Sequence, residues 1–442
     1  MPHVISELAA FCLATDTVDD RVQQAALRTL LDTIGVAAIG SMTSGGRASF
    51  DAAPAVWGSG RSRVWFSGRQ LTAPGAVFVN ATYAASLDLD DGHRGAAGHP
   101  AAAIVPAVLA LAGDRALSAS RLLTAIALGY EVAVRVAASR DVNALRTTDS
   151  GLWCGYGTAA AATWLLGCSA PVAAQAMAIS GQTATGQYAT GWTRLGHTVK
   201  EGIPWAAANG VQAAFLAAAG HTGPIDLLDE ASVYDRTKLL DRDRSWAVEQ
   251  AYFKRYSCCR WAHAAIDAAL LLQEEHLLVG SEIEEILVET FERALTLPNQ
   301  PAPTSNEAAQ YSIPFCVAVA LLHGKAALLP LEDRYLADSA VLALASRVTL
   351  KTNPRYAGAF PSTTPATLSI VSGGRRFALE VVRPKGEPTN PMSGEELAHK
   401  FEALTSRLPI SKMKILAIAE TIRGFGREST TADLLNALCN PS

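Results

Sequence analysis

The stretch FKRYSCCRWAHAAIDA, residues 253–268, separates two different patterns in this 442-residue chain. Before it, one amphipathic helical pattern follows another, with few charges and many alanines. After it, segments appear in which apolar and polar residues alternate, which is typical of half-buried β-strands. The chain is therefore predicted to have two parts, and this stretch is predicted to lie where they meet.

The first part reads as a helical bundle. Apolar residues recur at three- and four-residue spacing in VDDRVQQAALRTLLDTIGVAAIG, residues 18–40, and Ser118 is placed to cap a helix that follows it. Many of the helical segments carry alanine and glycine, which let helix backbones approach closely. No fixed repeat period is present, so a packed bundle is favoured over a solenoid. Three further helices are predicted over residues 157–167, 169–182 and 203–220.

The second part mixes strands and helices. Strand patterns cover residues 281–294, 346–353 and 366–382, and Gly373-Gly374 is suited to a two-residue hairpin turn. Helical patterns return near the C-terminus. The predicted fold is mostly α with an α+β insertion, in which a large all-α bundle is interrupted by a smaller domain. The predicted limits are 1–262 for the all-α domain, 263–394 for the inserted α+β domain and 395–442 for the returning C-terminal helices.

Composition excludes several classes of function. Charged residues are 18% and hydrophobic residues 49% of the chain, which indicates a large core and a buried subunit interface. The net charge is -4 with both signs interspersed, so no nucleic-acid partner is expected. The apolar runs are too short to cross a bilayer, and the N-terminus lacks a basic leader. The seven scattered cysteines form no CxxC pair, which indicates reduced thiols in a cytoplasm.

The segment SLDLDDGHRGAAGHP, residues 86–100, places charged groups between two apolar segments. Asp88, Asp91 and His99 could form an acid/base set in a loop that leaves the core, because buried polar groups need partners. The alternative is that Asp90 and Asp91 cap a helix and the histidines are solvated. An acidic metal site is less favoured, because a helix precedes the segment and DLLDE, residues 226–230, resembles an ordinary helix start.

Three other clusters are candidates for the site. His197 and Lys200 precede a helix and could receive a carboxylate, although a solvated loop lysine is the alternative. Lys254, Arg260 and His263 have the composition of an anion site. Cys258-Cys259 invites a thiol mechanism, but neighbouring cysteines more often pack as small hydrophobes. The fourth cluster, RTTDSGLWCGYGTAAAA at residues 146–162, contains Asp149 and lacks the spacing of a dinucleotide fingerprint.

In this order, the clusters resemble the MmgE/PrpD family, which includes 2-methylcitrate dehydratase, cis-aconitate decarboxylase and iminodisuccinate epimerase. The matching stretches lie between about residues 20 and 400, and the most specific are LDLDDGHRGAAGHP, VKEGIPWAAANG, FKRYSCCRWAHAAIDA and PKGEPTNPMS. The resemblance implies a helical domain interrupted by an α+β domain, with the active site in the cleft between them. It also implies a cytoplasmic homodimer that needs no organic cofactor or metal.

The resemblance assigns site residues one by one. Asp88 is similar to the family's active-site aspartate, and His99 to the histidine that closes the same stretch. Lys200 and Lys254 match two family lysines. Three positions depart from the dehydratase and decarboxylase pattern, because Asp149 stands in place of a histidine, Phe315 in place of a tyrosine and Gly92 in place of a threonine.

These assignments imply an enzyme that moves a proton at a carbon next to a carboxylate. His99, oriented by Asp88, is the expected first base, and His93 or Lys200 the second. Lys200 and Lys254 are expected to stabilise the enolate-like intermediate. The expected substrate-binding residues are Asp91, Gly92, His197, Arg260, His263 and Phe315.

The three departures favour an epimerase acting on a small di- or tricarboxylate. The alternatives are a hydro-lyase with Asp149 as the acid, a decarboxylase, and a carboxylate-binding protein without catalysis. An iron–sulfur route is excluded, because no three cysteines lie close enough in the sequence.

Overall fold

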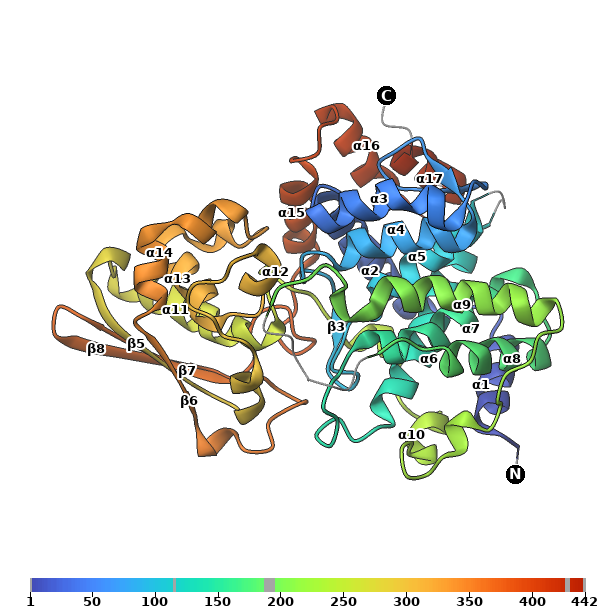
Figure 1. The fold of residues 1–442 in the computed structure, drawn as a ribbon, viewed down its shortest axis with the longest axis horizontal. Helices are drawn as coiled ribbons and strands as arrows, with labels where there is room; N and C mark the ends of the chain where they lie inside the picture. The colour runs from blue at the N-terminus through green and yellow to red at the C-terminus, as the bar shows by residue number, and fades with distance from the viewer. Residues whose placement is uncertain (1, 114–116, 187–194, 426–429, 440–442) are drawn as a thin grey trace.

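The computed structural model describes residues 2–113, 117–186, 195–425 and 430–439. Figure 1 shows a larger body made of helices and a smaller body that combines helices with a four-stranded sheet. The strand β3 (Gly92–His93) lies between the two bodies in this view. The chain is therefore mostly helical with few strands, as predicted.

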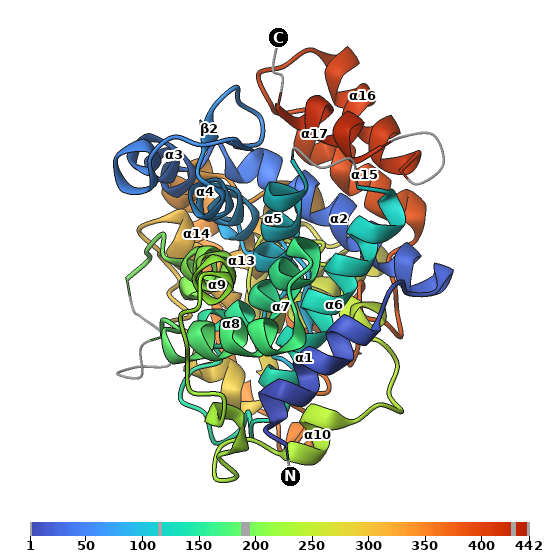
Figure 2. The ribbon, with the colours of Figure 1, turned by 90° about the vertical axis from the view of Figure 1, so that its right-hand side faces the viewer.

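The larger body is a bundle of helices from both ends of the described chain. Figure 2 shows α1, α6, α7 and α8 on the side that faces away from the sheet. The helix α2 begins after the N-cap Asp19, and α6 begins after Ser118, whose side chain accepts a hydrogen bond from the Arg121 N–H as predicted. The helices are α1 (Val4–Ala14), α2 (Asp20–Gly40), α3 (Ser44–Trp57), α4 (Ala73–Ala85), α5 (Ala101–Ala112), α6 (Ala119–Ala138), α7 (Cys154–Leu166), α8 (Ala170–Gln182), α9 (Ile203–Ala218), α10 (Arg236–Leu240), α15 (Gly394–Thr405), α16 (Lys412–Arg423) and α17 (Thr431–Cys439).

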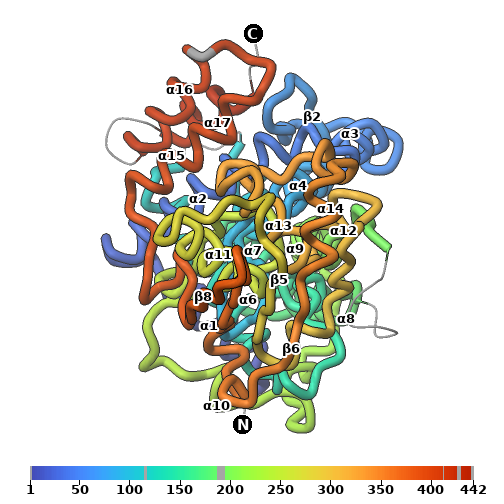
Figure 3. The backbone as a smooth tube through the Cα atoms, turned by 90° about the vertical axis from the view of Figure 1, so that its left-hand side faces the viewer, coloured from blue at the N-terminus to red at the C-terminus, as the bar shows by residue number. Residues whose placement is uncertain are grey.

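The smaller body contains a sheet with the strand order β6-β5-β7-β8. The central pair β5 and β7 is antiparallel, β5 and β6 are parallel, and β7 and β8 form a hairpin. The turn residues Gly373 and Gly374 both have positive φ, 57° and 70°, as a type I′ hairpin requires. Figure 3 views this body from its free side. Its elements are α11 (His263–His276), β5 (Ile283–Thr290), α12 (Asn306–Ala309), α13 (Ile313–His323), α14 (Ser339–Ala345), β6 (Val348–Thr352), β7 (Ala366–Ser372) and β8 (Arg375–Val381).

Two large hydrophobic cores lie in the two bodies. The first contains buried side chains from Val4 to Phe253 and again from Met392 to Cys439. The second contains buried side chains from Tyr256 to Ile370. The change from one core to the other therefore falls within residues 253–256, inside the stretch that separates the sequence patterns. Whether the domain limits lie at residues 262 and 394 stays a prediction.

Among the described residues, two pairs of two-residue strands lie outside the main sheet. The strands β1 (Ser62–Arg63) and β2 (Gln70–Leu71) pair with each other near α3 and α4. The strand β3 pairs with β4 (Ala251–Tyr252), which comes directly before the stretch that joins the two cores. This second pairing attaches the polar loop between α4 and α5 to the junction of the two bodies.

No helix of the described residues is by itself long and apolar enough to cross a membrane. The helices α2 and α3 reach the required length and composition only together, and they are bent by 88° relative to each other.

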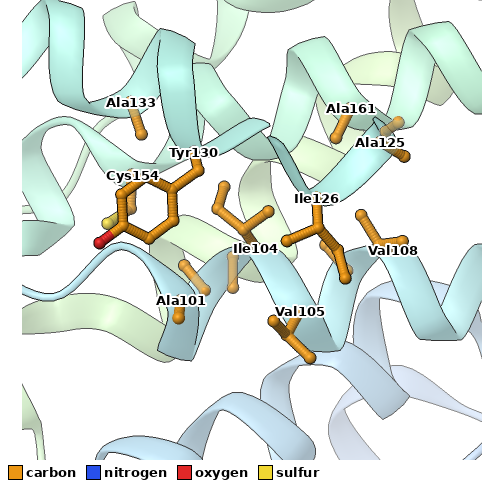
Figure 4. Close-up of a cluster of buried hydrophobic side chains, with 14 of the residues drawn as sticks. Ala101, Ile104, Val105, Val108, Ala125, Ile126, Tyr130, Ala133, Cys154 and Ala161 are labelled. Carbon is orange, nitrogen blue, oxygen red and sulfur yellow. The ribbon is translucent and has the colours of Figure 1, made fainter. Parts of the chain in front are cut away.

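Small residues allow the central helices to approach closely, as the sequence predicts. Figure 4 shows Ile104 of α5 and Tyr130 of α6 packed among alanine side chains. A Cβ atom added to Gly157 of α7 would lie 2.2 Å from the carbonyl oxygen of Gly129 on α6 and 2.7 Å from Ala133 Cβ. The contact between α6 and α7 therefore has no room for a side chain at this point.

We expect Gly157→Ala to destabilise the protein by about 2 kcal/mol, because inserting a methyl group there forces the two helix backbones apart. The urea denaturation midpoint measures this loss. Gly394→Ala is the matched control, because a Cβ atom there meets nothing within 4 Å. An equal effect of the two substitutions would contradict the close packing of α6 and α7.

Candidate active site

The polar loop of residues 86–100 leaves α4 and reaches the junction of the two bodies before α5 begins. Its first residues alternate, so that Leu87 and Leu89 pack in a small apolar cluster with Val36 and Ile39 of α2 and Leu404 of α15. Asp88 between the two leucines has a positive φ of 50° and is 3% exposed. The leucines anchor the loop in the larger body and leave the Asp88 carboxylate on the other side.

Four consecutive carbonyl groups of this loop, those of residues 86–89, each accept a hydrogen bond from a side chain of a distant segment. The donors and distances are Gln310 Nε2 to Ser86 O at 3.3 Å, Ser257 Oγ to Leu87 O at 2.7 Å, Lys254 Nζ to Asp88 O at 2.9 Å and Lys400 Nζ to Leu89 O at 2.9 Å. A buried irregular backbone needs such partners, because it has no helix or sheet to satisfy it. The two bodies and α15 therefore fix the loop together.

Lys254 and Asp88 form a buried ion pair. Lys254 has no exposed surface, and its Nζ lies 3.0 Å from Asp88 Oδ1. Burial alone would raise the pKa of Asp88, but the positive charges of Lys254 and Lys200 outweigh it and hold that pKa well below its usual range. Burial lowers and the Asp88 charge raises the pKa of Lys254, and the net effect is a raised pKa. Both groups are therefore charged at neutral pH, and this ion pair is not anticipated from the sequence.

His99 is held in one tautomer with one nitrogen available. Its Nδ1 lies 2.8 Å from the carbonyl oxygen of Asp91, so Nδ1 donates and Nε2 keeps its lone pair. The Nε2 atom lies 3.6 Å from Asp88 Oδ1. Burial, reinforced by Lys254, lowers the pKa of His99 to about 3. The imidazole is therefore neutral at physiological pH. The Asp91 carbonyl makes the hydrogen bond that orients the ring, whereas Asp88 faces Nε2 at 3.6 Å, and the orientation by Asp88 stays a prediction.

The Asp91 carboxylate binds groups of the helices α5 and α6. One carboxylate oxygen accepts from the Ala101 N–H at 3.1 Å and so caps α5, and the other accepts from the Tyr130 hydroxyl at 2.8 Å. Burial raises the pKa of Asp91 to about 7. Asp91 is absent from the pocket lining described below. The prediction that Asp91 caps a helix is thus confirmed. The same interpretation expected the histidines to be solvated, and this is wrong for His99, which is 8% exposed.

A small pocket opens beside His99 at the junction of the two bodies. Its cavity volume is about 30 Å³, and a bound water needs about 10–15 Å³ by this measure, so it holds about two waters. Substrate entry therefore requires side chains or bodies to move. The lining residues are His93, Arg94, Ala97, His99, Thr148, Glu201, Tyr252, Cys259, Arg260, Trp261, Phe360 and Pro361.

Gly92 and His93 take the short strand β3 past Tyr252. A Cβ atom on Gly92 would lie 2.3 Å from the Tyr252 ring, so only glycine fits there while Tyr252 keeps this position. His93 lines the pocket, and its Nδ1 atom has no hydrogen-bond partner among the described residues. Burial lowers the pKa of His93 to about 3, so it is a second neutral imidazole at the pocket.

Lys200 and Glu201 precede α9 in an unusual backbone. Their φ angles are 47° and 56°, and Gly202 continues the left-handed run at 69°. Lys200 Nζ donates to Gln310 Oε1 at 2.7 Å and lies 3.2 Å from the Tyr311 hydroxyl. Lys200 is buried, so the solvated-lysine alternative is wrong. Glu201, which the sequence analysis does not single out, lines the pocket instead.

Arg260 lines the pocket, but its guanidinium group is already paired with the carboxylate of Glu387. Its Nε and Nη2 donate to Glu387 Oε1 at 3.0 and 2.6 Å, and Arg94 binds the same carboxylate from the loop of residues 86–100. Burial would raise the pKa of Glu387, but Arg260 and Arg94 hold it below its ordinary value. Arg260 therefore binds an anion, as predicted of its type, but in this structure the anion is the Glu387 carboxylate of the protein itself.

His263 supports Arg260. Its Nδ1 accepts from Arg260 Nη1 at 3.1 Å, and its Nε2 lies 3.3 Å from the Cys258 carbonyl oxygen. Burial lowers the pKa of His263 well below its ordinary value. Both ring nitrogens are thus engaged in a neutral side chain, and His263 is not part of the pocket lining.

Three other predicted residues lie outside the pocket lining. Asp149 stands next to the lining residue Thr148, and burial raises its pKa. His197 is exposed over much of its surface. Burial of the remainder and, to a smaller extent, the positive charge of Lys200 lower its pKa. Phe315 belongs to the core of the smaller body. The structure does not bring the Phe315 ring to the pocket.

Residues that sequence reasoning missed carry recognisable signals. Glu201 is adjacent to a predicted lysine, Arg94 lies within the charged loop, and Glu387 lies in the PKGEPTNPMS stretch. Each was visible as a charged residue inside a matching stretch. None has a local pattern that shows which distant partner its charge meets.

The cysteines of this region are protonated thiols. Cys259 lines the pocket, and burial raises its pKa well above the ordinary value, as it does for Cys258. A thiol nucleophile needs a lowered pKa, so the packing interpretation is favoured.

Asp88, Asp90 and His99 are the group within the described residues that could hold a metal ion, since one ligand atom of each lies within 4.8 Å of the others. The Lys254 ammonium already lies 3.0 Å from Asp88 Oδ1, so an ion there would face a positive charge. Burial raises the pKa of Asp90 well above its ordinary value, which disfavours the charged form that binds a metal ion. We therefore assign no metal to this group.

Comparisons with known proteins agree with this architecture. A model of the MmgE/PrpD N-terminal domain matches residues 6–243, and a model of the MmgE/PrpD C-terminal domain matches residues 256–422. The human cis-aconitate decarboxylase is 28% identical over 411 residues, which cover 88% of this chain and 84% of that protein. The break between the two family models includes the residues at which the cores change.

We expect Glu387→Gln to destabilise the protein by about 3 kcal/mol, because it leaves the guanidinium of buried Arg260 without a negative charge. Urea denaturation measures the loss. Glu395→Gln replaces an exposed carboxylate of α15 and is expected to change stability by less than about 0.5 kcal/mol. If both variants behaved alike, the Arg94–Glu387–Arg260 contact would not be a stabilising interaction.

Proposed function

Because the chain belongs to the MmgE/PrpD family, we propose that it is an enzyme that transfers a proton at a carbon next to a carboxylate of a small di- or tricarboxylate. The observation that carries the proposal is the state of His99. Its Nδ1 is committed to the Asp91 carbonyl, and its neutral Nε2 stands at a pocket wall beside the Asp88–Lys254 pair. A fixed imidazole with a free lone pair is suited to remove a proton.

The cations of the site would stabilise the negative charge that develops in the reaction. Removing a proton next to a carboxylate moves an electron pair toward the carboxylate oxygens, and a buried ammonium lowers the energy of that charge. Lys254 and Lys200 are the two buried lysines near His99, since their charges lower the His99 pKa. We assign them this role, with Arg94 and Arg260 at the pocket wall as fixed neighbours.

We propose epimerisation as the reaction. His93 and His99 line the same pocket, and both are neutral at physiological pH. Two bases allow one to remove the proton and the other to return it. Epimerisation needs no acid for a leaving group, which suits a site in which Asp149 does not line the pocket.

Decarboxylation is the second candidate, and the cis-aconitate decarboxylase relative supports it. The same cations would stabilise the carbanion that remains after carbon dioxide leaves. Dehydration with Asp149 as the acid requires Asp149 to turn toward the pocket. A carboxylate-binding protein without catalysis is the candidate from another class. We also propose a homodimer in the cytoplasm that works without an organic cofactor or metal.

We expect the wild-type protein, incubated in heavy water with iminodisuccinate, 2-methylcitrate or cis-aconitate, to exchange a carbon-bound proton for deuterium. Proton NMR measures the exchange and shows any new product. Exchange with loss of chirality identifies an epimerase, and an alkene or a decarboxylated product identifies a lyase. Saturable binding without exchange would mean that the chain is a binding protein.

His99→Asn is expected to slow the exchange by at least about 100-fold with binding retained, because it removes the proton acceptor. The rate of deuterium incorporation measures the loss, and isothermal titration calorimetry measures binding. His399→Asn on exposed α15 surface is the control and should leave the rate unchanged. Full activity of His99→Asn would show that His99 is not the base.

A further inference from the structure

Glu201 is a buried carboxylate at the pocket for which the mechanism above has no role. Its side chain is 9% exposed and lines the pocket together with His99. Its Oε1 atom lies 3.9 Å from His99 Nε2, the nitrogen that is free to accept a proton. A carboxylate placed this close to a base, in a cavity that holds water, is within reach of it through one bridging molecule.

Ser150 fixes Glu201 and His99 relative to each other. The Glu201 Oε2 atom accepts hydrogen bonds from the Ser150 N–H at 3.1 Å and from the Ser150 hydroxyl at 2.9 Å. The same hydroxyl oxygen accepts from the His99 backbone N–H at 3.0 Å. One carboxylate oxygen is thus fully engaged, and the other is left toward the imidazole.

The backbone at Glu201 is held in a conformation that few non-glycine residues adopt. Lys200, Glu201 and Gly202 all have positive φ, between 47° and 69°. Two consecutive non-glycine residues in this region cost conformational energy, and surrounding contacts have to hold them there. The result is that Lys200 points to Gln310 while its neighbour Glu201 points to Ser150 and the pocket.

We propose that Glu201 is the carboxylate that receives from His99 the proton removed from the substrate and returns it to His99 in the reverse direction. This inference rests on the proposed function. His99 would act at the carbon, and Glu201 would hold the proton while the imidazole regains its neutral form.

The proton balance needs no other reactant. The substrate C–H bond breaks, its electron pair goes to the enolate oxygens, and the proton forms a bond to His99 Nε2. That N–H bond then breaks, and the proton bonds to Glu201 Oε1 directly or through a water. The imidazole returns to its starting state, and Glu201 becomes a neutral carboxyl group. The enolate carbon then takes a proton on its other face from a water molecule bound at His93. The hydroxide that remains is neutralised by the proton that Glu201 releases, so no net proton is gained or lost.

Electrostatics supports this division of work. Burial, together with the charges of Asp149 and Asp88, outweighs the Ser150 hydrogen bonds and raises the pKa of Glu201 to about 7. The pKa of His99 is about 3, so its imidazolium is a strong acid that passes its proton on. The titratable groups that interact with Glu201 are His99, Asp88, Asp149, Cys154 and Tyr311.

The test is Glu201→Gln, which keeps an acceptor for Ser150 but cannot take up a proton. We expect the deuterium exchange rate to fall by about 100-fold with little change in KM. In the wild type, kcat should rise with pH through about 7, because the carboxylate form of Glu201 is the acceptor. This limb should be absent in Glu201→Gln, and Glu201→Asp should restore part of the rate and the limb.

Glu274→Gln, on the exposed surface of α11, is the matched control and should keep the wild-type rate and pH profile. A Glu201→Gln enzyme with the wild-type rate and profile would overturn the role of Glu201 and leave the proposed function intact. Wild-type protein that exchanges no proton of any of the three substrates would instead refute the proposed function, and the inference with it. That result is seen without any variant.

A second measurement does not depend on catalysis. The infrared band of a neutral carboxyl group should disappear as the pH is raised through about 7 in the wild type and in Glu274→Gln. Glu201→Gln should lose one neutral carboxyl band at low pH in the difference spectrum against the wild type, while the band of Asp91, whose pKa is also about 7, should remain. A band unchanged by Glu201→Gln would show that Glu201 does not hold a proton in this range, and it would overturn the inference.

Discussion

The architecture depends on four hydrogen bonds, in which side chains from distant segments donate to the consecutive carbonyl groups of residues 86–89. A loop this deeply buried would be unstable alone, because each unpaired carbonyl costs about 1–3 kcal/mol. Its donors come from three separate regions, and Lys254 combines two tasks, since it binds the Asp88 carbonyl and neutralises the Asp88 side chain. The placement of Asp88 therefore depends on side chains from both bodies.

The site has more buried acids than a dry cavity can ionise, and protonation resolves this excess. Asp88 keeps its charge because Lys254 is next to it, whereas burial raises the pKa of Asp90 and Asp91. Burial likewise raises the pKa of Glu201 to about 7, the value of Asp91. One short region thus contains a carboxylate that is charged at neutral pH and two that are near their midpoint. All of these residues are aspartates or glutamates with similar ordinary pKa values. Their different protonation states are therefore set by the surrounding side chains.

The sequence predicted what local patterns determine. Helix periodicity located α2 and α6, Ser118 was identified as the cap of α6, alternation located β5 to β8, and Gly373-Gly374 located the hairpin. The close association of Asp88, His99 and Lys254 followed from matching motifs. Contacts between residues far apart in the chain could not be predicted, because nothing in the sequence near Arg260 indicates that it pairs with Glu387. The sequence left the role of Asp91 open between two interpretations for the same reason, since its partners Ala101 and Tyr130 belong to two helices farther along the chain.

Lys400 has a consequence for the order in which the molecule can be built. It lies on α15, binds Asp32 of α2 at 2.6 Å and holds the Leu89 carbonyl from a position 311 residues later in the chain. During synthesis the N-terminal segments emerge first and begin to fold. Until α15 leaves the ribosome, Asp32 lacks the ammonium that binds its carboxylate directly, and the loop lacks one of its four hydrogen-bond donors. The nascent chain thus carries an incomplete larger body throughout translation of the smaller one.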